Sequence, residues 1–95
     1  MNIGIASCDE MNTFLAQVVV ALCEVYAVEV AEQLVQDYYI KFTDLVYCKS
    51  IGIPCQDDDF MFHEGVRGMA LRVHYYLGIA GDPDPHRFVE WRSTL

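Results

Sequence analysis

The stretch CQDDDFMFHEGVRGMALRVHYY, residues 55–76, holds the side chains of this 95-residue chain that are best suited to chemistry. Three consecutive carboxylates open it, and His, Glu and Arg side chains follow. In a helix, four of these residues would lie along one stripe: Asp59, His63, Arg67 and His74. They are separated by steps of 4, 4 and 7 residues. Because His is the usual acid–base residue and a common metal ligand, such a stripe could serve a small metal-dependent or acid–base enzyme.

The spacing of the two histidines argues against a metal site on one helix. His63 and His74 are eleven residues apart, which is about 16 Å along a helix that rises 1.5 Å per residue. HEGVR lacks the second His of an HExxH site, and the chain has no GxGxxG, GxxxxGK[ST] or GxSxG motif. Only a subunit interface could gather Asp59, His63, Glu64 and His74. We expect no catalytic residue, metal or cofactor, with His63 and His74 as the alternative metal pair.

The same stretch is typical of a helix start. Asp57 is suited to the N-cap, and Asp58 and Asp59 then lie in the first turn, where carboxylates interact favourably with the helix dipole. Gly65 and Gly68 suggest close approach of another group, from within the chain or from a partner. If the stretch contacts a partner, the predicted binding residues are Asp57, Asp58, Asp59, Glu64, Arg67 and Arg72.

The formal net charge of −8 limits the class of partner. Binding to a nucleic-acid backbone or to an anionic membrane relies on clustered Lys and Arg, so neither is expected. The acidic residues either form a solvated face or meet a basic protein surface. We therefore predict a noncatalytic protein-binding module, for example a bacterial or phage-type inhibitor or adaptor acting on a nucleic-acid-handling protein. A structural assembly subunit is a further alternative.

The periodicity predicts an all-α fold in a single domain, residues 1–95. We expect helices near 8–26, 29–50, 58–79 and 85–92, arranged as a small bundle of three main helices plus a short C-terminal one. Ser7 and Glu10 form a potential capping box at the first helix. Gly52 and Gly81 are expected to end the second and third helices, and Asp84 with Pro85 to begin the last.

Each main helix has a predicted apolar face. The first comprises Met11, Phe14, Leu15, Val18, Leu22, Val25 and Tyr26; the second Ala31, Leu34, Val35, Tyr38, Phe42, Leu45 and Val46; the third Phe62, Val66, Met69, Val73, Tyr76 and Leu77. The first two faces lie roughly opposite each other, so either the chain turns between residues 26 and 29 or one long helix serves two neighbours. Covering both faces favours an intertwined or side-by-side homodimer, with a predicted interface at Val18, Leu22, Leu34 and Tyr38.

The four cysteines indicate the cellular compartment. Their spacings of 15, 25 and 7 residues give no CxxC pair, so reduced, mostly buried thiols fit better than a zinc site. The N-terminal MNIGIASCDE lacks the basic region of a secretory leader, and charged residues interrupt the longest apolar run. We expect a cytoplasmic protein without a membrane span.

Overall fold

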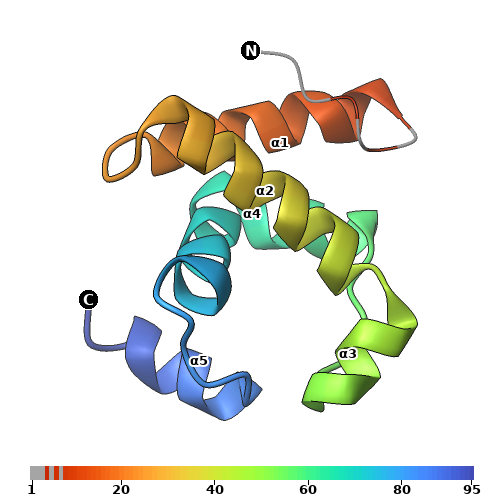
Figure 1. Cartoon of the computed structure of the whole chain (residues 1–95), viewed down its shortest axis with the longest axis vertical. Coiled ribbons are helices and arrows are strands. Elements are labelled where there is room, and N and C mark those ends of the chain that lie inside the picture. The colour runs from red at the N-terminus through yellow and green to blue at the C-terminus, as the bar shows by residue number, and fades with distance from the viewer. Residues whose placement is uncertain (1–3, 5, 7) are drawn as a thin grey trace.

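The structure is a computed structural model that describes residues 4, 6 and 8–95. Within these residues the chain is all-helical (Figure 1). The elements are α1 (Asp9–Leu22), α2 (Val28–Phe42), α3 (Leu45–Ile51), α4 (Asp58–Val73), the π-helical turn η1 (His74–Gly78) and α5 (Pro85–Arg92). The predicted all-α bundle is confirmed, although its second and third predicted helices are subdivided.

The chain turns between α1 and α2, so the alternative of one long helix does not hold. Cys8 occupies the N-cap of α1 without a side-chain capping bond, and Ser7 of the predicted capping box lies outside the described residues. α1 ends at Leu22, earlier than predicted, which leaves Val25 exposed instead of on the apolar face. α1 then packs against both α2 and α4, and its apolar face is covered from two sides.

The predicted helix 29–50 is wrong, because the chain breaks at Thr43 and Asp44. The Thr43 hydroxyl donates to the Tyr39 carbonyl oxygen at 2.6 Å, and the Asp44 carboxylate accepts from the Val46 amide at 2.9 Å as the N-cap of α3. The break changes the direction of the helix. Leu45 and Val46 are consequently 56% and 78% exposed instead of extending the buried face of α2.

Two predicted helix boundaries are confirmed. Gly52 ends α3 with a φ of 76°, the left-handed conformation that glycine adopts without steric cost. Asp84 caps α5 by accepting from the His86 amide at 2.9 Å, with Pro85 as the first helical residue. Phe88, one turn further on, is fully buried. The last helix therefore docks its aromatic side on the bundle.

The predicted continuous helix 58–79 is also wrong, because α4 is kinked at Gly65, whose φ of 82° and ψ of 169° are not helical. The kink shifts the buried face before it: Met61 is buried, whereas Phe62 is 39% exposed and meets the Phe14 ring edge-on at 5.3 Å. After Val73 the backbone widens into η1, which ends at Gly78 and not at Gly81.

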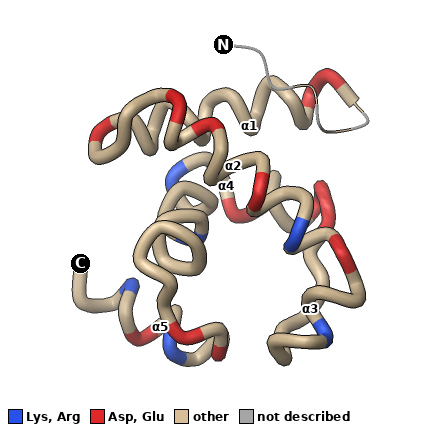
Figure 2. The backbone as a smooth tube through the Cα atoms, viewed as in Figure 1, with Lys and Arg blue, Asp and Glu red and all other residues tan. Residues whose placement is uncertain are grey.

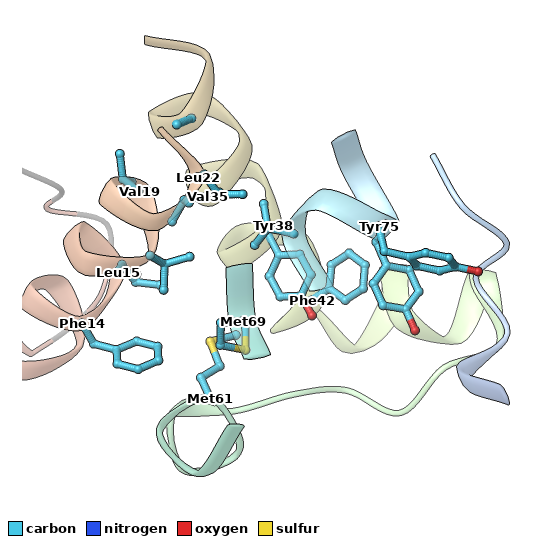
Figure 3. Close-up of a cluster of buried hydrophobic side chains, with 14 of the residues drawn as sticks. Phe14, Leu15, Val19, Leu22, Val35, Tyr38, Phe42, Met61, Met69 and Tyr75 are labelled. Atoms are coloured by element: carbon cyan, nitrogen blue, oxygen red, sulfur yellow. The ribbon is translucent and has the colours of Figure 1, made fainter. Parts of the chain in front are cut away.

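The core forms where α1, α2, α4 and η1 meet, as Figure 3 shows. It includes three of the four residues predicted for a dimer interface: Val18, Leu22 and Tyr38 are buried by their own chain, and Leu34 is half-buried. A second copy cannot reach these buried side chains in this conformation. Homodimerisation remains a prediction, and in this conformation it would use residues other than Val18, Leu22 and Tyr38.

Candidate functional site

The first turn of α4 borders an open hollow of about 450 Å³. Its lining residues come from the end of α2, from the loop before α4 and from the start of α4. They are Tyr39, Thr43, Gln56, Asp57, Asp58 and Asp59. We call this the acidic hollow, because its three charged residues are all carboxylates.

The start of α4 is held in place by its own carboxylate. The Asp57 side chain accepts a hydrogen bond from the Phe60 amide at 2.8 Å, which confirms the predicted N-cap. Asp58 and Asp59 follow in the first turn. There the free amide groups of the helix end stabilise negative charge, so three adjacent carboxylates are tolerated.

Two tyrosines of α2 fix the opposite wall. The hydroxyl of Tyr38 donates to the side-chain Oε1 of Gln56 at 2.8 Å. The backbone N–H of Gln56 donates to the Phe42 carbonyl oxygen, also at 2.8 Å. The neighbouring Tyr39 hydroxyl donates to Asp58 Oδ1 at 2.9 Å. Burial, together with this hydrogen bond and the negative charge of Asp58, raises the pKa of Tyr39 to about 12. Tyr39 therefore remains a neutral donor at physiological pH.

The hollow is accessible and carries uncompensated negative charge. Asp57 and Asp59 are exposed and Asp58 is half-buried. The lining contains no Lys or Arg, and the ion pairs found among residues 4, 6 and 8–95 do not involve these three carboxylates. The arrangement offers carboxylate oxygen atoms to a basic side chain.

Two of the other predicted binding residues, Glu64 and Arg72, are engaged within the chain. Glu64 accepts from Arg72 Nε at 3.0 Å and from Arg92 Nη1 at 2.8 Å. The Arg72 guanidinium also lies over the Phe88 ring, 4.6 Å from its centroid. Gly68 is required here, because the Glu64 side chain occupies the space that a Cβ would take. This cluster fastens α5 to α4, and the close approach anticipated for Gly68 is internal.

The two histidines are not brought together. His63 is exposed, and its Nδ1 lies 2.9 Å from the Asp59 backbone carbonyl oxygen. His74 lies beyond the Gly65 kink and bonds to the Tyr26 hydroxyl at 2.6 Å. Across the described ranges, no group of three or more His, Cys, Asp or Glu residues is placed to hold a metal ion.

Sequence reasoning missed the tyrosine, threonine and glutamine side of the hollow. Tyr39 is nineteen residues from Asp58, a separation for which no short motif exists. The prediction of mostly buried thiols is wrong as well: Cys48 is buried, but Cys8, Cys23 and Cys55 are exposed. Cys8 and Cys23 lie at the two ends of α1, a position that apolar composition alone does not reveal.

Comparisons with protein-family models, with curated proteins and with solved structures found no match to this chain. In the described part of the chain, none of the helices combines the length and the apolar character that a membrane span requires. The function must therefore be inferred from the geometry and charge of the chain's own residues.

Proposed function

We propose that this protein is a noncatalytic binding protein whose acidic hollow accepts a basic side chain of a partner protein. The observation that supports the proposal is that Asp57, Asp58 and Asp59 all line one open hollow whose lining contains no basic residue. The Tyr39 hydroxyl and the α4 backbone already fix two of these carboxylates. Binding therefore needs little reorganisation of the acidic side.

Charge at the hollow is expected to influence association more than final affinity. Complementary charges steer two proteins together and are screened by salt. Arginine is the best-suited basic group, because its planar guanidinium can donate to two carboxylate oxygens at once. One specific form of the proposal is an inhibitor or adaptor that meets a surface shaped for phosphates on a nucleic-acid-handling protein.

A capture experiment with two matched variants tests the proposal. Asp58→Asn with Asp59→Asn removes two charges from the hollow and keeps the oxygen that accepts from Tyr39. Glu29→Gln with Glu32→Gln removes the same charge in the first half of α2, about 10 to 15 Å along the helix from Tyr39. Each protein is immobilised and exposed to a lysate of the source cells over a series of salt concentrations, and captured proteins are quantified by mass spectrometry.

The proposal predicts a specific ranking. Basic proteins captured by the unmodified chain should be lost with the hollow variant and retained with the α2 variant, and high salt should release them. Equal losses in both variants would show that only net charge matters and would contradict the proposal. Retention by the hollow variant would place the contact elsewhere.

Association of two copies is a separate proposal. Four valines at or near the α1–α2 corner are exposed and therefore available to a second chain: Val20, Val25, Val28 and Val30. Burying these side chains between two chains would remove apolar surface from water, which favours association.

A further inference from the structure

A second cavity, of about 410 Å³, lies beyond the Gly65 kink. One wall comes from the end of α1 and the turn after it, and the other from the second half of α4. The apolar side chains of the two walls are Ala21, Leu22, Val25, Val66, Ala70 and Leu71. We call it the apolar pocket. Its size falls within the range of small-molecule sites, which are mostly apolar with a few placed polar groups.

His74 is a polar residue of the pocket, and contacts with neighbouring side chains fix its ring. Its Nδ1 bonds to the Tyr26 hydroxyl at 2.6 Å, and its ring centroid is 5.6 Å from that of Tyr26 and 5.9 Å from that of Trp91. The Tyr26 hydroxyl is itself confined, because it fills the space beside Gly78 that a side chain would need. The imidazole is therefore held in one orientation before any ligand binds.

The contact is compatible with a donor at His74 Nε2. Burial raises the pKa of Tyr26, so its hydroxyl keeps its proton and can donate to His74 Nδ1. In that arrangement the imidazole carries a proton on Nε2. Among the hydrogen bonds of the described residues, none occupies this Nε2. His74 also opens the π-helical turn η1, a backbone feature frequent at functional sites.

Arg67 supplies positive charge at the rim of the same pocket. It is exposed, and it has no carboxylate partner among the ion pairs of residues 4, 6 and 8–95, whereas Arg72, Arg87 and Arg92 all have one. The single carboxylate of the lining, Glu24, belongs to the turn after α1. A guanidinium and an imidazole N–H that line one pocket are suited to a carboxylate ligand.

We propose that the apolar pocket binds a small molecule that has an apolar body and a carboxylate. The apolar body packs between the walls from α1 and α4, and the carboxylate accepts from His74 Nε2 and pairs with Arg67. Because the site shares no lining residue with the acidic hollow, this proposal does not depend on the proposed partner binding.

Three probes of one shape test the ligand class by calorimetry and by amide chemical shifts: 4-phenylbutyrate, 4-phenylbutan-1-ol and 4-phenylbutylamine. The expected order of affinity is carboxylate, then alcohol, then amine, with saturable shifts at Ala70, Leu71 and His74. Tightest binding of the amine would mean that Glu24 dominates and would overturn the proposal. Equal affinities, or the absence of saturable shifts at the pocket, would overturn it as well.

Two exposed arginines provide a matched pair of variants. Arg67→Gln should weaken binding of 4-phenylbutyrate about fivefold, the loss expected for one charge-assisted contact at a rim, and leave the alcohol unaffected. Arg87→Gln makes the same change in net charge on α5 and should alter neither probe. If both variants weaken the carboxylate equally, long-range charge explains the preference and the assigned site is wrong.

Discussion

The two halves of this bundle are held together by different forces. In the α1–α2 half, the contacts are aliphatic and aromatic side chains at regular helical spacing, such as Leu15 and Val35. In the α4–α5 half, a kink at Gly65, a π-helical turn and a carboxylate bound by two arginines interrupt that regularity. The comparison teaches that both candidate sites lie where the backbone of α4 begins, bends or widens.

The two halves also differ in their distribution of charged residues. Figure 2 shows acidic residues around the α1–α2 turn and mixed charges on α5. The acidic residues of the turn, Glu24 and Glu29, are exposed and do not enclose the acidic hollow. At the start of α4, by contrast, carboxylates line a concave surface with fixed neighbours. Shape, and not acidity alone, distinguishes the candidate site.

The largest predicted effect is in the α1–α2 half. Val18 is 1% exposed, so Val18→Asp would bury an unpaired carboxylate and should unfold the protein, at a cost of about 4 kcal/mol or more. Gln17, the preceding residue, is exposed, and Gln17→Asp should change the free energy of unfolding by less than about 0.5 kcal/mol. Denaturant unfolding followed by circular dichroism measures both. Similar losses in the two variants would contradict the burial described for α1.

A smaller effect is predicted in the α4–α5 half. Glu64→Ala leaves Arg72 and Arg92 without their shared carboxylate and should cost about 2 kcal/mol, because the cluster is largely but not fully shielded from water. Glu90→Ala removes a solvent-exposed partner of Arg87 and should cost less than about 0.5 kcal/mol. The same unfolding measurement compares them. A cost for Glu64→Ala no larger than that for Glu90→Ala would mean that the polar cluster does not fasten α5.

The smallest predicted effect appears only at alkaline pH. Burial raises the pKa of Tyr38 well above its ordinary value of 10.0. A raised folded-state pKa gives stability that is fully present below about pH 10 and is lost as the pH rises, because the unfolded chain releases the proton first. Stability should therefore fall above about pH 10. Tyr38→Phe should cost about 1 kcal/mol at pH 7 through the lost bond to Gln56, but reduce the alkaline decline.

An alkaline decline of equal slope in both proteins would assign it to the other groups whose pKa burial raises. These are Tyr26, Tyr39, Cys48, Tyr75 and Tyr76. Urea unfolding at pH 7 and at several values above pH 10 distinguishes the two cases.

The sequence predicted the helical content and most of the core because apolar periodicity acts over many residues. It placed Phe14, Val18 and Val35 correctly on buried faces. It did not predict the breaks at Asp44 and Gly65. Each break depends on a single residue, and that residue could also occupy the interior of a continuous helix. Polar capping and a positive φ decide such positions, and a hydrophobic pattern carries no information about either.

The candidate site was predictable in part. The Asp57 cap and the two carboxylates after it follow from local helix chemistry, and they are where the sequence indicates. The contribution of Tyr39 and Gln56 depends on how α2 meets the start of α4, which is set by packing between distant segments. Glu64 and Arg72 were expected to face a partner, yet their pairing with each other and with Arg92 arises only when α5 docks.

The most direct test of the acidic hollow compares it with the acidic turn between α1 and α2. Isotope-labelled protein is titrated with the tripeptide acetyl-Gly-Arg-Gly-amide, and with the matched norleucine peptide as the uncharged control, while amide chemical shifts are recorded. We predict saturable shifts for the arginine peptide at Asp57, Asp58, Asp59 and Tyr39, absent from the norleucine titration and abolished by Asp58→Asn with Asp59→Asn. Shifts of equal size around Glu24 and Glu29, or none at the hollow, would contradict the assignment of the hollow as the binding site.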